Sequence, residues 1–128
     1  MATSAPIKFT LIRMAEEQRK TVRLKKALGM QYLSASQVWV TGLLRDISES
    51  GLSFTSDESF SKDSIITLRI KFPFNPFQWV ELKGRCLEVK GLSIGIYINR
   101  LEFVDLEEEE QRVIREYITW ALEKGLGI

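Results

Sequence analysis

The sequence predicts a mainly β fold, a small antiparallel β-barrel of six to seven strands followed by one C-terminal α-helix. Three observations predict it. Apolar and polar residues alternate with a period of two through the centre of the chain, which is typical of half-buried strands. Short clusters of turn-forming residues separate these runs, as in small barrels that close their edges. Near the C-terminus the apolar period becomes that of an amphipathic helix.

Three short apolar runs begin the predicted barrel, at residues 27–33, 37–45 and 51–55. Three further runs alternate more clearly between apolar and polar side chains, at residues 66–72, 80–83 and 93–98. Clusters of serine, proline or glycine lie between the runs and predict turns at residues 34–36, 56–59, 73–76 and 90–91. Together the runs place the barrel at about residues 27–104.

An aromatic cluster surrounds two prolines between the fourth and fifth of these runs. Its members are Phe72, Phe74, Phe77 and Trp79. The simpler interpretation is that these rings cap one end of the barrel. In the alternative interpretation, an exposed Phe74 or Phe77 forms a tip that binds a partner protein.

The last element is a helix at about residues 106–124. Asp105 is its predicted N-cap, and Glu108 three residues later completes a capping-box pattern. The acidic run at residues 107–110 lies in the first turn, where the helix dipole favours negative charge, so capping explains this run better than a metal or partner role. Gly125 is a suitable stop. The predicted apolar face consists of Val113, Ile114, Tyr117, Ile118, Ala121 and Leu122.

Length and composition indicate one soluble domain with a buried core. The chain has 128 residues, of which 45% are hydrophobic and 27% charged. A net charge of +1 gives no bulk attraction to nucleic acid or to a membrane surface. Cys86 is the single cysteine, which excludes an internal disulfide and fits a reducing compartment. Without a signal peptide or an apolar run of transmembrane length, we expect a cytoplasmic protein without membrane insertion.

The sequence offers no argument for catalysis or for metal binding. It contains no histidine, which removes the commonest general base and the commonest metal ligand. One cysteine without histidine makes neither a thiol dyad nor a zinc site. Glycine-rich phosphate-binding motifs are missing too. We therefore expect no catalytic residue, no metal site and no enzyme.

Two short motifs carry the functional prediction. Arg19 and Arg23 form an R-x-x-x-R pattern, and Asp46, Ser48 and Gly51 form a D-x-S-x-x-G pattern. Arginines supply fork-shaped donors for phosphate oxygens and for the O6/N7 edge of guanine. An aspartate accepts from a guanine N–H or holds an arginine, a serine adds a hydroxyl, and a glycine lets backbone approach a ligand. The two motifs together predict a pocket for an anionic guanine nucleotide.

Each motif alone has a simpler explanation. A solvated basic segment explains the arginines, since seven basic residues lie between residues 8 and 26 against two acidic ones. A hairpin with an Asx or Ser turn explains the second motif. Residue frequencies put the chance of both motifs in this order and spacing below about 1%. The pair therefore favours the nucleotide pocket.

The pair resembles the PilZ domain, the bacterial receptor module for cyclic di-GMP. That family carries R-x-x-x-R just before its barrel and D/N-x-S-x-x-G at the turn after an early strand. A barrel followed by a helix is also the PilZ layout, and residues 102–106 resemble its strand-to-helix junction. One departure is Asn99-Arg100, where the family often has glycine. The resemblance covers about residues 18–120 and implies an extension at 1–17 before a PilZ-like domain at 18–128.

The resemblance implies a receptor or adaptor that binds cyclic di-GMP as its ligand and uses no other cofactor. Arg19 and Arg23 would bind phosphate and the Hoogsteen edges of guanine, Asp46 and Ser48 would contact guanine and orient the arginines, and Gly51 would hold the turn open. Binding would change the conformation of the N-terminal segment. An unidentified downstream protein would then regulate a bacterial process such as motility or biofilm formation.

Two other functions remain open from the sequence. A PilZ-like adaptor would dock on a protein without needing nucleotide, but adaptors of that type usually lack the two motifs. A small barrel that binds nucleic acid would interleave basic residues with exposed aromatics, and residues 13–26 contain no aromatic residue. We therefore expect no nucleic-acid partner.

Overall fold

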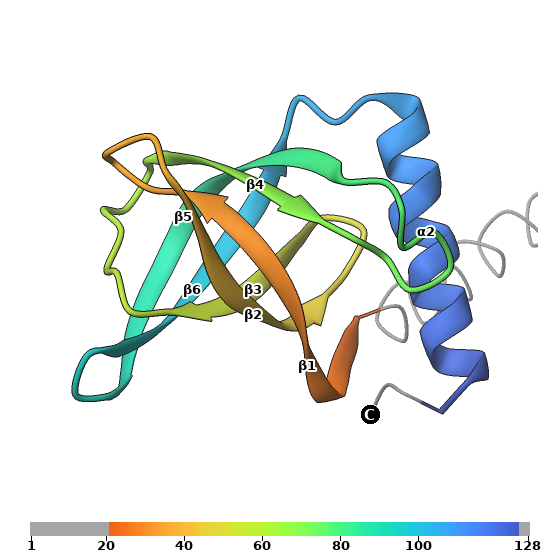
Figure 1. Cartoon of the computed structure of the whole chain (residues 1–128), viewed down its shortest axis with the longest axis horizontal. Helices are drawn as coiled ribbons and strands as arrows, with labels where there is room; N and C mark the ends of the chain where they lie inside the picture. Colours follow the sequence, from red (N-terminus) through yellow and green to blue (C-terminus); the bar gives the residue numbers. More distant parts are fainter. Residues whose placement is uncertain (1–20, 126–128) are drawn as a thin grey trace, which may run out of the picture.

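The computed structural model describes residues 21–125, and the side chain of Lys26 is left out of that description. Within this range the chain forms six strands and one helix (Figure 1). They are β1 Val22–Leu33, β2 Trp39–Ile47, β3 Gly51–Ser56, β4 Ile65–Ile70, β5 Val80–Ser93, β6 Ile96–Val104 and α2 Glu108–Glu123. The predicted mainly β fold with a C-terminal helix is confirmed. None of the helical structure in this range is both long and apolar enough to cross a membrane.

The strands form a closed antiparallel barrel in the order β1-β2-β3-β6-β5-β4. Pairing of β1 with β4 closes it, with Met30 opposite Ile70 and Tyr32 opposite Leu68. Over residues 30–32 and 68–70 this pairing leaves neither strand with a free edge. It also fixes which side chains point inward and which point outward, because successive residues of a strand alternate between the two faces.

β1 and β5 are both longer than predicted, and β6 runs later than its predicted range at 93–98. β1 begins at Val22, and its register against β2 shifts between Arg23 and Leu28, so the chain bulges there. β5 continues through residues 90–91, so the turn predicted there is wrong. The hairpin turns instead at Ile94-Gly95, where Gly95 has φ 75°. Glycine adopts this left-handed conformation without strain, whereas Gly91 keeps an ordinary strand φ and pairs with Tyr97.

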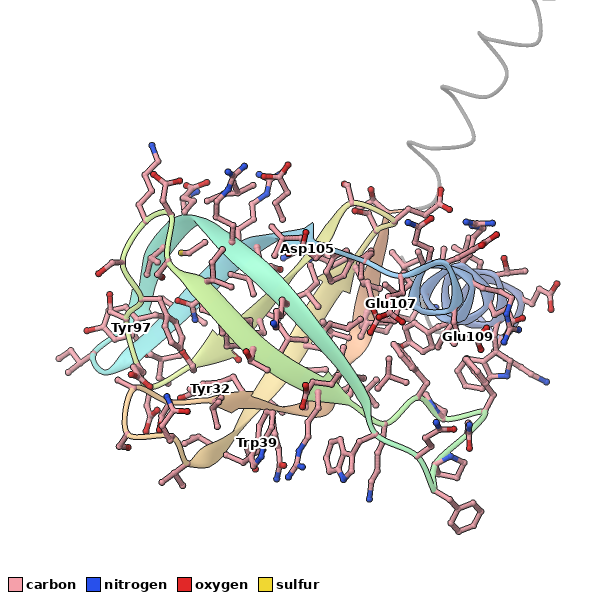
Figure 2. The ribbon with its side chains drawn as sticks, turned by 90° about the horizontal axis from the view of Figure 1, so that it is seen from above. Tyr32, Trp39, Tyr97, Asp105, Glu107 and Glu109 are labelled. Carbon is pink, nitrogen blue, oxygen red and sulfur yellow. The ribbon has the colours of Figure 1, made fainter. Side chains whose placement is uncertain are left out.

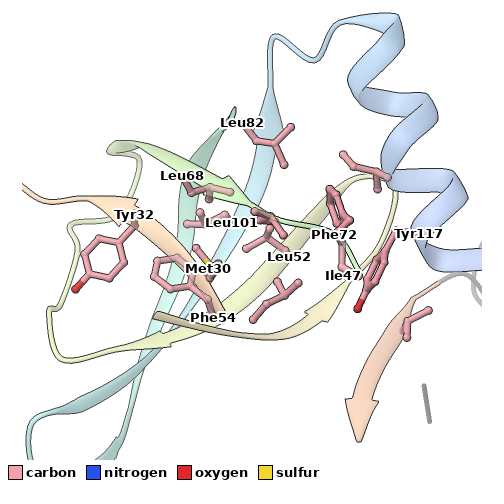
Figure 3. Packing of buried hydrophobic residues seen from close by; sticks show 14 of the residues in the cluster. Met30, Tyr32, Ile47, Leu52, Phe54, Leu68, Phe72, Leu82, Leu101 and Tyr117 are labelled. Carbon is pink, nitrogen blue, oxygen red and sulfur yellow. The ribbon is translucent and has the colours of Figure 1, made fainter. Parts of the chain in front are cut away.

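The barrel interior is filled by side chains from all six strands (Figure 3). The largest fully buried ones are Tyr32, Phe54, Phe72, Met30, Leu44, Ile47, Leu68, Ile70, Leu82 and Leu101, with Ile114 and Ile118 from α2. At the end that α2 covers, the rings of Phe72 and Tyr117 lie 4.9 Å apart. The predicted aromatic cap is therefore confirmed for Phe72. In contrast, Phe74 and Trp79 are partly exposed, and Phe77 is 95% exposed.

The helix begins two residues later than predicted. Its N-cap is Glu107, not Asp105, and the capping box joins Glu107 to Glu110. Asp105 has φ 53° and lies in the segment that crosses from β6 to the helix (Figure 2). Aspartate tolerates this left-handed conformation, so the residue turns the chain instead of capping it. Gly125 follows the last turn with φ 67°, which confirms the predicted stop, whereas Leu122 of the predicted apolar face is exposed.

Asn99 takes an unexpected place in the barrel. It is fully buried, and its amide nitrogen donates to the hydroxyl of Ser56 at 2.8 Å. Pairing between β3 and β6 stays regular on both sides of it, with Phe54 opposite Asn99. The departure from glycine at this position therefore adds a buried polar contact and leaves the register of β3 against β6 intact.

β3 and β6 approach each other closely where β3 begins. A Cβ atom on Gly51 would lie 2.0 Å from the carbonyl oxygen of Leu101, which is less than any real contact allows. Gly51 is not among the described residues with positive φ. Glycine is therefore required here for space and not for backbone freedom.

Tyr32 combines burial with a hydrogen bond at the barrel end away from α2. Its hydroxyl donates to Asp57 at 3.1 Å. Burial, and then this contact, raise the pKa of Tyr32 from 10.0 to about 12. The raised pKa means that the folded state favours the neutral phenol. Its contribution to stability is fully present below pH 10.0 and is lost as the pH rises through about 12.

Gly51→Ala should lower the free energy of unfolding by about 2 kcal/mol or more, because the new methyl group displaces β6. Gly91→Ala is the matched control, since a Cβ there meets nothing within 4 Å. It should change stability by less than about 0.5 kcal/mol. Denaturant unfolding of the two variants measures the difference, and equal losses would contradict the close approach.

Tyr32→Phe should cost about 1 kcal/mol near neutral pH, the net contribution of one hydrogen bond. Above pH 10.0 the parent should lose stability faster than the variant, because only the parent has this phenol to ionise. Denaturant unfolding at several pH values measures both effects. Parallel pH curves for the two proteins would show that Tyr32 does not ionise with a raised pKa.

Candidate functional site

The D-x-S-x-x-G motif forms the turn between β2 and β3. The Ser48 hydroxyl oxygen accepts from the backbone N–H groups of Ser50 and Gly51, both at 3.3 Å. The backbone N–H of Ser48 donates to the Gly51 carbonyl at 2.8 Å. Ser48 therefore holds the shape of the turn, as the simpler interpretation of this motif predicts. A further bond from the N–H of Phe103 to the Ser50 carbonyl, at 2.8 Å, fixes the turn against β6.

Next to this turn is an open pocket of about 790 Å³ on the outer face of the barrel. Three of the five predicted site residues line it, namely Asp46, Ser48 and Gly51. The opposite wall comes from β5 and β6 and includes Lys90 and Arg100. Because the barrel interior is filled by the core, this outer hollow is where the turn can meet a ligand.

Arg23 lies at the edge of this pocket, although it is not among the lining residues. It pairs with Asp46 across β1 and β2. Cross-strand partners present their side chains on the same face of a sheet. Val22 is fully buried whereas Thr21 and Arg23 are exposed, so Arg23 shares the outer face with Thr21, which lines the pocket. Arg19 lies outside the described residues.

Gly51 contributes differently from the prediction. We expected its missing side chain to let backbone approach a ligand, but the space is taken by the carbonyl of Leu101. The glycine therefore sets how closely the turn lies against β6. Its effect on the pocket acts through the position of the turn.

The sequence did not point to Lys90 or Arg100. The sequence predicts a turn at Lys90, and Arg100 is distinguished only as a departure from the glycine that is common in the family. Arg100 pairs with Ser53 of β3, which brings it to the wall beside the motif turn. The alternation predicted at residues 93–98 has Ile94 and Ile96 on the apolar face of the strand, and this phase is wrong, because both are exposed whereas Asn99 and Leu101 are buried. Arg100 therefore points outward, beside β3.

The pocket lining carries charges of both signs, with Asp46, Glu88 and Glu102 beside Lys90 and Arg100. Glu102 of the lining is engaged by Arg85 at 2.5 Å. Among the ion pairs found in residues 21–125, none uses Arg23, Lys90 or Arg100. These three cations are therefore available to phosphate oxygens, which bind well to guanidinium forks and ammonium groups.

One exposed ion pair links the motif turn to the helix. The Arg115 guanidinium of α2 donates to the Glu49 carboxylate at 2.7 Å. Both side chains are substantially exposed, so this pair contributes about 1 kcal/mol at most. It nevertheless places the turn and the helix in direct contact.

Nothing in the described part of the chain resembles a metal centre. No group of three or more Cys, Asp or Glu side chains between residues 21 and 125 is arranged to hold a metal ion. Cys86 is buried and unpaired, and burial raises the pKa of its thiol. A thiol in that state is a poor nucleophile.

Comparison with solved structures finds proteins of the same fold. The Bacillus subtilis inhibitor of motility (MotI/DgrA) gives a TM-score of 0.67 at 17% identity, over 81% of this chain and 51% of that chain. K. pneumonia MrkH in its apo state gives 0.66 at 11% identity, over 82% and 50%. The PilZ domain of Escherichia coli YcgR with c-di-GMP gives 0.64 at 9% identity, over 82% and 89%.

These identities show a shared fold. This chain spans about half the length of MotI and MrkH, with 51% and 50% of those chains covered. No curated protein matches it in a sequence comparison. A comparison with protein families matches residues 17–120 to the PilZ domain. This match covers most of the chain and includes both motifs, and the chain therefore belongs to the PilZ domain family.

Proposed function

We propose that this protein is a receptor for cyclic di-GMP and not an enzyme, and that it acts in the cytoplasm. One observation carries the proposal: the D-x-S-x-x-G turn lines an outer pocket, and Arg23 of the R-x-x-x-R motif lies opposite Asp46 at its edge. This pairing brings Arg23, the described arginine of the R-x-x-x-R motif, next to Asp46 of the second motif. The structure of the YcgR PilZ domain with c-di-GMP, which has the same fold, supports this choice of ligand.

The chemistry of the pocket suits two guanines bridged by two phosphates. Arg19 and Arg23 would bind phosphate oxygens and the O6/N7 edge of guanine through their paired donors. Asp46 would accept from a guanine N–H or hold one arginine. Ser48 and Gly51 would act by shaping the turn, in line with the contacts that they make.

Lys90 and Arg100 would add positive charge on the opposite wall. They face the motif turn from β5 and β6, so a ligand between the two walls would meet cations on both sides. A nucleotide with one phosphate or one guanine would engage only part of this set. Selectivity would therefore favour the cyclic dinucleotide.

Binding would also change the conformation of the chain around the pocket. Thr21 lines the pocket, and Arg19 precedes it by only two residues, so ligand contacts at Arg19 would fix the chain beside the site. Ordering backbone costs roughly 1–2 kcal/mol per residue, which the phosphate contacts would have to exceed. The altered surface would be offered to an unidentified downstream protein that controls a process such as motility or biofilm formation.

Calorimetric titration of the full chain with cyclic di-GMP tests the proposal. We expect a dissociation constant of about 1 µM or tighter, which corresponds to about −8 kcal/mol. GTP and cyclic AMP should bind far more weakly. If high micromolar cyclic di-GMP gives neither heat nor a thermal shift, the receptor function is wrong and the nucleotide-independent adaptor is favoured.

Arg19→Ala and Arg23→Ala should each weaken binding by roughly 1.5–3 kcal/mol, the value of lost charge-assisted hydrogen bonds. Arg23 is exposed, so its variant should melt at nearly the parent temperature. Lys62→Ala, which removes an exposed cation between β3 and β4, is the control and should bind like the parent. Arg→Lys should restore little binding because an ammonium lacks the fork. Parent-like affinity in the lysine variants would refute the role of the fork.

A further inference from the structure

A second hollow lies beside the first turns of α2, between this helix and the segment that joins β4 to β5. It measures about 520 Å³ and shares no lining residue with the pocket beside Asp46. We call it the helix groove. Phe74 and Trp79 line it from the β4–β5 segment, and Val113 lines it from α2.

The aromatic wall of the helix groove is held in place from behind. Phe74 stacks on the buried Phe72, with ring centroids 5.9 Å apart and an interplanar angle of 8°. Phe72 in turn packs against Tyr117 of α2. Phe74 is therefore fixed although 39% of it is exposed. A fixed apolar surface loses little side-chain entropy when a partner covers it.

Trp79 is fixed by cations on the barrel surface. The Arg69 guanidinium lies 4.5 Å from the Trp79 ring and 4.1 Å from the ring of Trp39, which is on the outside of the barrel (Figure 2). Gln31 accepts from Arg69 at 2.8 Å, and the Lys71 ammonium lies 4.6 Å from Trp79. Cation–π contacts of this kind hold an exposed indole in one place.

Carboxylates surround these rings. Those that line the helix groove are Glu81, Glu107, Glu109, Glu110 and Glu116. The single cation of the lining is Arg112, which is engaged by Glu109 and by Glu116. The hydrogen bond from Arg112 lowers the pKa of Glu109, so that carboxylate stays charged. A protein with a net charge of +1 thus concentrates negative charge around one apolar hollow.

Helix capping accounts for only part of this arrangement. Glu107 and Glu110 form the capping box. Capping does not explain Glu81, which comes from β5, or the aromatic wall, which comes from the β4–β5 segment. The helix groove is therefore formed by three parts of the chain, namely β5, α2 and the β4–β5 segment. The β4–β5 segment also carries Phe77, which is 95% exposed.

We propose that the helix groove docks a segment of a partner protein in which lysines or arginines flank an apolar or aromatic side chain. The apolar side chain would cover Phe74 and Trp79, and the flanking cations would meet the glutamates. Aromatic anchors surrounded by polar contacts are typical of the centre of protein interfaces. The basic N-terminal segment of this chain is a less suitable occupant, because Thr21, which immediately precedes β1, lines the other pocket.

Fluorescence anisotropy of the full chain with two labelled peptides tests the charge and the anchor. In the first peptide, lysines flank a Leu-Trp pair, and in the second, glutamates replace the lysines. The lysine peptide should bind, and its affinity should fall as salt rises because the charges are exposed. Failure of the lysine peptide to bind, or equal binding of both peptides, would overturn the proposal.

Matched variants locate the binding. Phe74→Ala and Glu81→Lys should each weaken the lysine peptide about tenfold, as expected for interface anchors. The controls are Ile94→Ala, at the fully exposed β5–β6 turn, and Glu123→Lys, near the end of α2, and both should bind like the parent. One groove variant removes an apolar ring and the other reverses a charge. If one of them fails to fold, the other still tests the proposal. Equal losses in variants and controls would overturn the proposal.

Two further results would assign the helix groove to another occupant. Sedimentation that shows a dimer dissolved by Phe74→Ala would assign it to a second copy of the chain. Tighter binding of the lysine peptide to a variant with Lys8→Glu and Arg13→Glu would assign it to the chain's own N-terminal segment. Unchanged affinity in that variant and a monomer in sedimentation support the partner segment.

Discussion

Closure of the barrel by the pairing of β1 with β4 is the constraint on which the other features depend. Closure commits alternate side chains to a filled interior, so every ligand must be met from outside. The second pairing between strands far apart in the sequence places β3 beside β6. As a result, Arg100 lies across the pocket from the motif turn. Residue 51 must be glycine, because the carbonyl of Leu101 occupies the space that a Cβ atom would need.

The sequence sufficed for those features that depend on local pattern. Alternation located the strands, and spacing grouped Asp46, Ser48 and Gly51, which the structure places around one pocket. Features that depend on pairing between distant strands could not be predicted. Arg100 became a candidate only once its pairing with Ser53 was known. Likewise, the β5–β6 turn lies at Gly95 and not at Gly91. Both glycines suit a turn, so the sequence alone could not distinguish them, and only the pairing of the two strands does.

The helix connects the two surfaces of functional interest. It packs its buried face against the barrel end, touches the motif turn through Arg115, and supplies one wall of the helix groove. The Glu49–Arg115 pair is exposed and therefore too weak to transmit a large change by itself. Any coupling between nucleotide and partner would have to move the turn or the helix as a unit. The two surfaces also differ in charge. Charges of both signs line the pocket beside Asp46, whereas five glutamates and one arginine line the helix groove.

We propose that a cyclic dinucleotide binds on the outer face of the barrel between the motif turn and β6. Amide chemical-shift mapping of the isotope-labelled full chain during addition of cyclic di-GMP tests it most directly. We expect saturable shifts for the amides of Ser50, Gly51 and Arg100, with those of Phe74 and Glu81 little changed. Shifts confined to the helix groove, or saturation without any change in the motif turn, would contradict it.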